Sequence, residues 1–321
     1  MGLVVLLHYA AACDDNFAEH FCVMAYSLLW RNKGARLHLI GLDLSASVLA
    51  TIEMFAQENQ FDIVHYNASV ERLSHLISSD RLPAAVWCRL LLPELLPPDV
   101  ERVVYLDCDT IVLCDISELG SLDLRGKPTA LAPDPMPSDR KRDLLKGLEL
   151  PVDDDYYNTG VMVMDLQQFR QQGLSEKIVE YAVRNPEKLQ FMDQCAINVA
   201  LHDDIFVIDS CYNAHPSWTE LWTIHPKVLH FMGIKPWQSN RPLVNFIYND
   251  ARQKISNIEP LESSKIVNEY FVIWLIIKYV RNLIKRPFRR EKRRVIYTEI
   301  RNYFHVFKYR FSLDFLVRGK T

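Results

Sequence analysis

Residues 103–113 read Val-Val-Tyr-Leu-Asp-Cys-Asp-Thr-Ile-Val-Leu, an apolar strand interrupted by two carboxylates, Asp107 and Asp109. Burying such charges costs on the order of several kcal/mol unless they are paired or bound to a metal. Residues i and i+2 of an extended chain point to the same side, so the two side chains should converge at the end of the strand. Two hard oxygen ligands at that point predict a site for Mn²⁺ or Mg²⁺.

Strand and helix signals alternate along the chain before this stretch. The periodicity predicts strands at 3–7, 37–42, 62–66 and 103–106, and helices at 17–30, 45–58 and 83–92. Further on it predicts helices at 140–148 and 192–198 and strands at 161–164 and 228–231. The β-α-β-α-β order predicts a mostly parallel α/β sheet with helices on both faces, and ligands of such sheets gather beyond the carboxyl ends of the strands.

The composition describes a folded protein. The 321 residues are 49% hydrophobic and 24% charged, which excludes a disordered chain and allows one large domain or two smaller ones. No run approaches the ~18 to 20 apolar residues of a membrane span, and residues 1–8 lack the features of a signal peptide. We therefore expect a cytoplasmic protein. The seven cysteines include no Cys-x-x-Cys pair, so we expect buried free thiols rather than a zinc ribbon or a disulfide framework.

Charge is divided unevenly along the chain. Residues 265–321 carry a net charge of +11, whereas residues 1–264 carry −14. Aromatic residues alternate with basic ones in the C-terminal part, and its longest apolar stretch, 271–277, is too short to cross a membrane. We predict a catalytic domain at 1–262 and a basic, aromatic-rich helical tail at 263–321 that attaches to an anionic membrane surface. The alternatives are a tail helix docked on the core and a tail that dimerises the protein.

The Asp-Cys-Asp stretch is one of six motifs that occur together in a known family. They are Ala12-Cys13-Asp14-Asp15-Asn16, Arg89, Asp107-Cys108-Asp109, Tyr157-Asn158-Thr159-Gly160, Asp193-Gln194 and His230-Phe231-Met232-Gly233-Ile234-Lys235-Pro236-Trp237. In this order they resemble glycosyltransferase family 8, especially the bacterial lipopolysaccharide glucosyl- and galactosyltransferases, over about residues 3–245. The resemblance implies a GT-A fold, a UDP-hexose donor, Mn²⁺, and transfer with retention of the anomeric configuration. The implied acceptor is a glycan such as a lipopolysaccharide core, at the cytoplasmic face of the inner membrane.

The same resemblance implies roles for individual residues. Donor binding falls to Ala12, Asp14, Asn16, Arg89, Asp107, Cys108, Asp109, Asn158, Gly233 and Lys235, and an acceptor contact to Asp134. The metal ligands are Asp107, Asp109 and His230, and the reacting sugar lies at Asp193 and Gln194. Without the family, Asp14 is a helix N-cap, Arg89 a surface helix charge and His230 a structural histidine. A single residue separates Gly233 from Lys235, where the family usually has two.

Retention requires either a covalent intermediate or attack from the face that the UDP leaves. Gln194 is a poor nucleophile, so we favour the second route. In it, Gln194 stabilises the oxocarbenium-like sugar, and a β-phosphate oxygen accepts the proton of the acceptor hydroxyl. Lys235 would offset the charge that develops on the departing diphosphate.

Two other functions fit parts of the sequence. The spacing of Asp107, Asp109 and Thr110 also resembles the nucleophile motif of haloacid dehalogenase phosphatases. However, about a hundred residues precede it, and the chain contains no Gly-Asp dipeptide for the later acidic motif of those enzymes. The basic, aromatic-rich tail could instead bind nucleic acid. It contains no recognised nucleic-acid motif, so we expect no nucleic-acid partner.

Overall fold

The computed structural model describes residues 6–69, 71, 84–216, 225–233, 235–238, 242–253 and 255. The predicted tail at 263–321 and residues 3–5 of the strand predicted at 3–7 lie outside them. Among the helices described, none is both long and apolar enough to cross a membrane.

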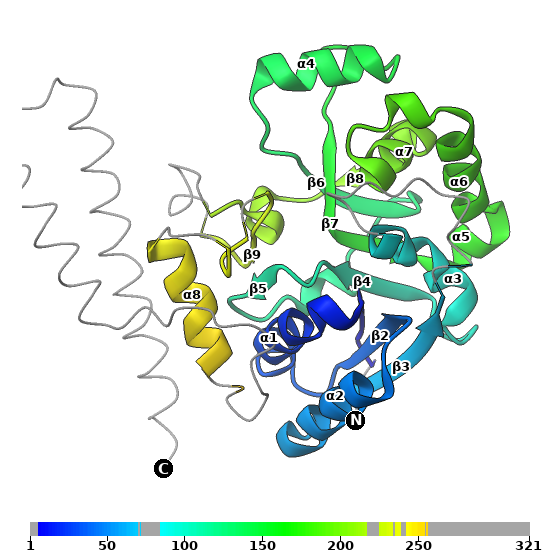
Figure 1. Cartoon of the computed structure of the whole chain (residues 1–321). Coiled ribbons are helices and arrows are strands. Elements are labelled where there is room, and N and C mark those ends of the chain that lie inside the picture. Colours follow the sequence, from blue (N-terminus) through cyan, green and yellow to red (C-terminus); the bar gives the residue numbers. More distant parts are fainter. Residues whose placement is uncertain are drawn as a thin grey trace, which may run out of the picture.

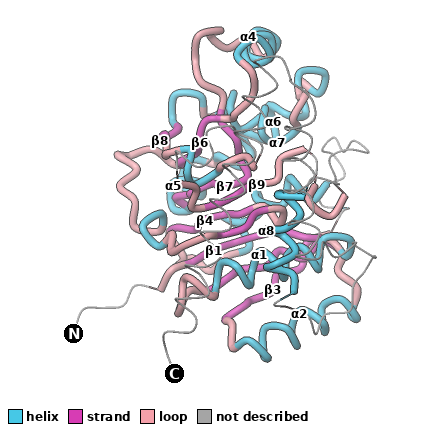
Figure 2. Tube along the Cα trace, turned by 90° about the vertical axis from the view of Figure 1, so that its left-hand side faces the viewer, coloured by secondary structure: helices cyan, strands magenta, loops and turns pink. Residues whose placement is uncertain are grey.

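A seven-stranded sheet forms the centre of the molecule, in the order β3-β2-β1-β4-β7-β6-β8 (Figure 2). The strands are β1 (His8–Cys13), β2 (Arg36–Leu42), β3 (Asp62–Ala68), β4 (Arg102–Leu106), β6 (Thr129–Pro133), β7 (Tyr157–Asp165) and β8 (Ile205–Val207). Neighbouring strands are parallel, except that β7 runs antiparallel to both β4 and β6. A separate antiparallel ribbon joins β5 (Thr110–Val112) to β9 (Val228–His230). The prediction of a mostly parallel α/β sheet is confirmed.

Helices cover both faces of this sheet (Figure 1). They are α1 (Ala18–Leu29), α2 (Ala46–Asn59), α3 (Leu92–Leu95), α4 (Ser138–Gly147), α5 (Leu166–Gln172), α6 (Leu174–Arg184), α7 (Met192–Ala200) and α8 (Pro242–Gln253). Residues of α1 and α2 share one apolar core with the sheet, and residues of α3, α5, α6 and α7 share the other. The helix α8 packs beside α1.

The central strand β4 shows why both faces need a cover. Its side chains alternate between the two cores: Val104 and Leu106 belong to the core that contains α1, and Val103 and Tyr105 to the opposite one. All four residues are almost completely buried. Because successive side chains of a strand point to opposite faces, a strand that is apolar on both faces belongs between two layers of helices.

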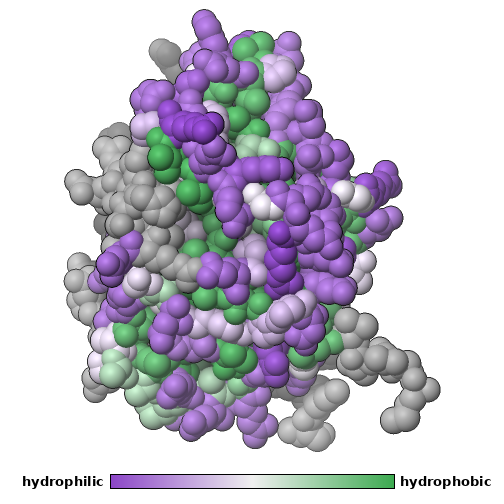
Figure 3. Space-filling view, turned by 90° about the vertical axis from the view of Figure 1, so that its right-hand side faces the viewer, coloured by the Kyte–Doolittle hydropathy of each residue, from purple (hydrophilic) through white to green (hydrophobic). Residues whose placement is uncertain are grey.

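The outer helix α6 divides into an apolar and a polar side. Leu174, Ile178 and Ala182 recur at a spacing of four residues and are buried, so one stripe of the helix packs on the core. Polar side chains cover most of the molecular face that carries α5 and α6, and hydrophobic ones gather in smaller patches between them (Figure 3).

The structure corrects several sequence predictions. Among the described residues the first strand is β1, and residues 6 and 7 of the strand predicted at 3–7 lie outside it. The alanines of β1 are buried between β2 and β4 although alanine has little intrinsic preference for strands. Most of the predicted helix 83–92 is a 3-10 segment, Ala84–Leu91, followed by α3. The apolar run 103–113 is not one strand, since a turn at Asp107–Asp109 separates β4 from β5. The described cysteines are free thiols, all buried except Cys114, as expected.

Candidate active site

The two carboxylates of the Asp-Cys-Asp stretch lie in the turn that follows β4. The backbone N–H of Asp107 donates to the carbonyl oxygen of Gly160 in β7 (2.8 Å), and the N–H of Thr110 donates back to the carbonyl of Asp107 (3.1 Å). These bonds fix the turn at the carboxyl end of a central strand. The carboxylate of Asp109 is buried, and that of Asp107 is a quarter exposed. The two side chains converge as predicted, but a turn brings them together and not an extended chain.

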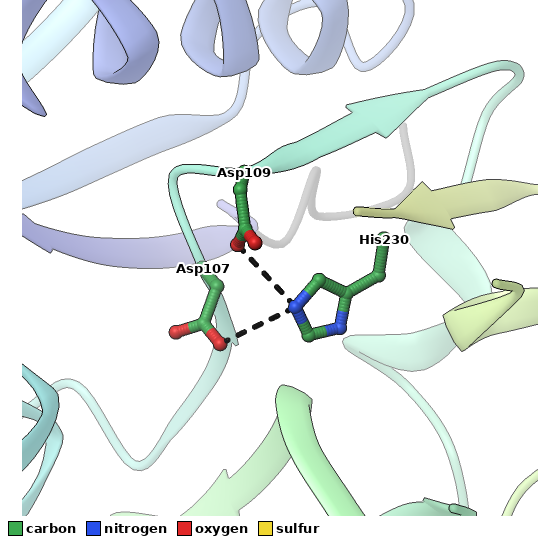
Figure 4. A group of neighbouring side chains, drawn as sticks. All are labelled: Asp107, Asp109 and His230. Atoms are coloured by element: carbon green, nitrogen blue, oxygen red, sulfur yellow. Dashed lines mark ion pairs between the residues drawn. The ribbon is translucent and has the colours of Figure 1, made fainter. Parts of the chain in front are cut away.

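The pairing of β5 with β9 brings His230 to this turn. Thr110 and His230 are direct partners in that ribbon, and the N–H of Phe231 donates to the carbonyl of Asp109 (2.9 Å). The Nε2 atom of His230 lies 3.3 Å from Oδ1 of Asp109 and 3.7 Å from Oδ2 of Asp107 (Figure 4). His230 is therefore part of the cluster, as well as being a buried residue of a strand.

This cluster has the composition of a divalent metal site. The nearest ligand atoms of Asp107, Asp109 and His230 all lie within 4.8 Å of one another. Two carboxylates and one imidazole suit Mn²⁺, and carboxylates alone would also hold Mg²⁺. The backbone around the cluster is tight, because an ideal Cβ at Gly160 would lie 2.0 Å from Cε1 of His230. The donor set and its convergence fit the predicted cation.

Lys235 reaches the same cluster from the loop after β9. Its ammonium group forms an ion pair with Asp109. The side chain therefore reaches the site although only one residue separates Lys235 from Gly233. Burial alone would raise the pKa of Asp109, but Lys235 and His230 hold it well below its usual range. Gly233 has a φ of 75°, which favours glycine. The ring of Trp237 stacks on His20 of α1 with centroids 3.4 Å apart, so the loop is anchored on the helix.

Arg89 is buried between two carboxylates. Its Nη2 atom donates to Oδ1 of Asp107 (2.9 Å), its Nε atom lies 3.0 Å from Oδ2 of Asp193, and its guanidinium lies over the ring of Tyr105. Burial lowers the pKa of Arg89, yet Asp107 and Asp193 more than offset this and raise it. The alternative that Arg89 is a surface charge is therefore wrong.

One carboxylate oxygen of Asp193, Oδ2, is buried and accepts no hydrogen bond. The Nε–H of Arg89 points to the carbonyl of Val86 (3.1 Å), so its 3.0 Å approach to Oδ2 of Asp193 is an ion pair without a hydrogen bond. Burial raises the pKa of Asp193 to about 6, although Arg89 opposes the shift. Asp193 also lines the cavity described below, and its carboxylate has capacity left to accept a hydrogen bond that the chain does not supply.

Three polar side chains form a network beside Asp193. The Nδ2 atom of Asn158 donates to Oε1 of Gln194 (3.0 Å) and to Oδ2 of Asp134 (3.0 Å), and Nε2 of Gln194 donates to the same Asp134 oxygen (3.1 Å). Asn158 lies inside β7, which begins four residues before the strand predicted at 161–164. The pairing of β6 with β7 shifts register next to it, and such bulges often re-aim a side chain beside a functional site.

The end of β1 forms the opposite wall. Asp14 caps the following turn by accepting from the N–H of Phe17 (3.0 Å), so the N-cap interpretation holds. The carbonyl of Ala12 accepts from the thiol of Cys108 (3.1 Å). Asn16 is exposed and, alone among the predicted site residues, does not line the cavity.

All the other predicted residues meet in one cavity of about 600 Å³. They are Ala12, Asp14, Arg89, Asp107, Cys108, Asp109, Asp134, Asn158, Asp193, Gln194, His230, Gly233 and Lys235. The wall also includes residues that sequence reasoning missed: Met136, Arg140, Phe191 and His215. Behind His230 lies a further missed residue, Asn213, at 2.9 Å from its Nδ1 atom. A lone asparagine after a tyrosine gives no signal in the sequence that could have identified it.

Comparisons with known proteins agree with this arrangement. The sequence model of glycosyl transferase family 8 matches residues 8–241. General stress protein A of Bacillus subtilis is 26% identical over 263 residues, which cover 73% of this chain and 88% of that protein. The lipopolysaccharide 1,2-glucosyltransferase of Escherichia coli K12 is 26% identical over 247 residues, 72% of each chain.

A solved structure shares the fold. The galactosyltransferase LgtC, crystallised with donor and acceptor sugar analogues, superposes with a TM-score of 0.70 over 80% of this chain and 98% of its own. The two sequences are 19% identical, so the likeness concerns the fold alone. It confirms the predicted GT-A architecture.

Proposed function

The chain belongs to glycosyl transferase family 8, and from this we propose that it transfers glucose or galactose from a UDP-sugar to a glycan hydroxyl, with retention of configuration. One observation carries the proposal. A single cavity is lined by three residues with converging metal-ligand atoms, by Lys235 and by the carboxylate residue Asp193. This combination suits a ligand that has a diphosphate at one end and hydroxyl groups at the other.

The diphosphate end belongs at the acidic cluster. Asp107, Asp109 and His230 would hold Mn²⁺, or Mg²⁺, which supplies positive charge for the phosphate oxygens. Lys235 now pairs with Asp109, and a diphosphate would offer its ammonium group a second anionic partner. As the bond to the sugar breaks, Lys235 would stabilise the charge that develops on the leaving group.

The rest of the donor would lie on either side of this cluster. Ala12 and Asp14 would contact the nucleoside at the end of β1, and Cys108 would support them through its hydrogen bond to Ala12. Asn16 does not line the cavity, so its position does not support the role proposed for it. Asp193 would accept a hydrogen bond from a hydroxyl of the donor sugar. Arg89 would act on the sugar through Asp193, since each of the three nitrogens of its guanidinium already donates to a group of the chain.

Gln194 lies where the reacting sugar would be held. Its amide is fixed by Asn158 and Asp134, and its neutral oxygen can stabilise a cationic sugar but is a poor nucleophile. We therefore retain front-face attack, in which a phosphate oxygen of the donor accepts the proton of the acceptor hydroxyl. A glycosyl adduct on Asp193 or Gln194, detected by mass spectrometry during turnover, would contradict this mechanism.

The acceptor would enter beside Asp134. A lipopolysaccharide core is the acceptor class that we propose, because a relative that covers 72% of this chain is named a lipopolysaccharide glucosyltransferase. The net charge of +11 in residues 265–321 supports a division into a catalytic domain at 1–262 and a membrane-attaching tail at 263–321. The enzyme would then work in the cytoplasm at the inner membrane. Salt-sensitive binding to anionic but not to neutral vesicles tests this placement.

The donor site is tested by calorimetric titration of the protein with UDP, with and without Mn²⁺. We expect binding that requires the metal and is lost in Asp109→Asn. The control is Asp62→Asn, which changes an exposed aspartate paired with Arg36 and absent from the cavity wall. Absence of binding in the wild-type protein under both conditions would refute the proposal. Release of UDP from UDP-glucose or UDP-galactose then identifies the sugar, and the anomeric configuration of the product tests retention.

A further inference from the structure

Asn213 lies behind His230, on the side away from the two carboxylates. It ends the 3-10 segment Ser210–Asn213 and is 1% exposed. Its Oδ1 atom lies 2.9 Å from Nδ1 of His230, and its Nδ2 atom donates to Oδ1 of Asn158 (2.8 Å). Figure 4 shows that Nε2 of His230 faces Asp107 and Asp109 and that the other ring nitrogen points away from them.

A backbone N–H group determines the orientation of the side-chain amides of Asn158 and Asn213. The N–H of Gly160 donates to Oδ1 of Asn158 (2.9 Å), and a backbone N–H cannot act as an acceptor. The Asn158 atom at that position is therefore the amide oxygen. The Asn213 atom that faces this oxygen must then be its amide nitrogen, so the amide oxygen of Asn213 faces His230.

This orientation selects the tautomer of His230. An amide oxygen can only accept, so Nδ1 of His230 carries the proton and donates to Asn213. In the neutral ring, Nε2 then carries the lone pair, on the side that faces Asp107 and Asp109. Only that tautomer can bind a cation together with the two carboxylates, and metal-binding histidines are commonly held in this way by a partner on the other ring nitrogen.

The series of hydrogen-bonded side chains continues from Asn158 to Gln194 and Asp134. With its oxygen fixed by Gly160 and Asn213, Asn158 directs its amide nitrogen to Oε1 of Gln194 and to Asp134. The amide nitrogen of Gln194 then faces Asp134. Asn213 and Asn158 therefore link the candidate metal ligand His230 to the candidate catalytic Gln194, and Asn213 does so without lining the cavity.

We propose that Asn213 is a positioning residue: it holds His230 in the metal-binding tautomer and holds Asn158, and through it Gln194, in one orientation. The role toward the metal rests on the proposed function, whereas the tautomer is a property of the protein without metal. Loss of such a partner typically weakens metal binding about 10- to 100-fold.

Two variants of Asn213 separate its hydrogen bond to His230 from its hydrogen bond to Asn158. Asn213→Leu keeps the size of the side chain and removes both hydrogen bonds. Asn213→Asp keeps an acceptor for Nδ1 of His230 but cannot donate to Asn158. The control is Asn32→Leu, which removes a 3% exposed asparagine that accepts from the hydroxyl of Tyr9 and the N–H of Ile116 and is absent from the cavity wall. It reports the cost of losing any buried asparagine.

The first readout is the ¹⁵N spectrum of the histidine rings in the metal-free protein, with the His230 signals assigned through His230→Gln. We expect a protonated Nδ1 in wild type, in Asn213→Asp and in Asn32→Leu, and a mixture of tautomers in Asn213→Leu. An unprotonated Nδ1 in wild type, or an unchanged spectrum in Asn213→Leu, would overturn the proposal.

The second readout is Mn²⁺ affinity in saturating UDP, measured by calorimetry. We expect a loss of about 10- to 100-fold in Asn213→Leu, near wild-type affinity in Asn213→Asp, and a lower turnover in Asn213→Asp because Gln194 loses its fixed orientation. Equal affinity in Asn213→Leu and Asn32→Leu would contradict a role in metal binding. If wild type binds no Mn²⁺, the proposed function fails, and the ring spectra still decide whether Asn213 sets the tautomer.

Discussion

Replacement of Gly160 by alanine tests the packing of the acidic cluster. An ideal Cβ at this position would lie 2.0 Å from Cε1 and 2.4 Å from Nδ1 of His230, and 2.9 Å from Oδ2 of Asp107. Ordinary contact begins at 3.4 Å, so the imidazole would have to retreat by about 1.4 Å. The backbone cannot absorb this shift easily, because β7 is hydrogen-bonded to strands on both sides.

The expected effect on metal binding follows from that distance. Metal–ligand distances in proteins stay within about 0.2 Å of their preferred values, so a retreat of 1.4 Å removes His230 from coordination. We expect Gly160→Ala to weaken Mn²⁺ binding in saturating UDP by about 100-fold, or ~2.7 kcal/mol. Overpacking should also lower the free energy of unfolding by about 1–3 kcal/mol.

Calorimetry and thermal melting measure the two effects. Gly147→Ala is the matched control, since no atom lies within 4 Å of its ideal Cβ and alanine favours the helix α4. Adding Gly160→Ala to His230→Ala should weaken Mn²⁺ binding much less than Gly160→Ala does alone, because the clashing ring is already gone and only the 2.9 Å contact with Asp107 remains. Mn²⁺ affinity within threefold of wild type in Gly160→Ala alone would refute the reasoning.

Three further changes test other contacts. Lys235→Met should raise Mn²⁺ affinity in the absence of UDP by about tenfold, because it frees Asp109 of a charged hydrogen bond worth ~1.5 kcal/mol or more. The same variant should bind UDP more weakly, and calorimetry measures both affinities. Burial lowers the pKa of His20 to about 3, so below about pH 6.5 the unfolded chain binds a proton that the folded protein does not. As the pH is lowered below about 6.5, the free energy of unfolding therefore falls by up to ~1.4 kcal/mol per pH unit. The variant His20→Asn should remove this one-proton slope in urea denaturation. Arg89→Met should cost about 3 kcal/mol or more of stability by leaving buried carboxylates unpaired, and adding Asp193→Asn should restore part of it.

Each of these has a clear contrary result. Unchanged metal affinity in Lys235→Met would mean that the lysine does not compete for Asp109. The same pH slope in His20→Asn and wild type would place the proton uptake on other buried histidines, such as His38, whose pKa burial lowers to about 4. Strictly additive costs of Arg89→Met and Asp193→Asn would show that the two charges do not interact.

The secondary structure was largely predictable where local pattern and burial agree. The helix predicted at 17–30 corresponds to α1, with Asp14 as the cap of the preceding turn, and the strand predicted at 62–66 lies in β3. Local pattern is misleading where tertiary packing overrides local preference. The alanines of β1 become a central strand only because neighbouring strands pair with them on both sides.

The sequence by itself determined the order of elements and the chemical types at the site. Apolar periodicity predicts strands and helices because these positions must be buried, and the carboxylates in an apolar stretch already point to a cation. The family motifs added His230 and Gln194 to that set.

Only the tertiary structure decided how these groups act on one another. His230 reaches Asp109 through the pairing of β5 with β9, and Arg89 is buried only because Asp107 and Asp193 close around it. Asn213 gains its place through bonds to residues distant in the chain. Distances of 3 Å and the directions of hydrogen bonds arise from packing between remote segments, and local sequence patterns carry no record of that packing.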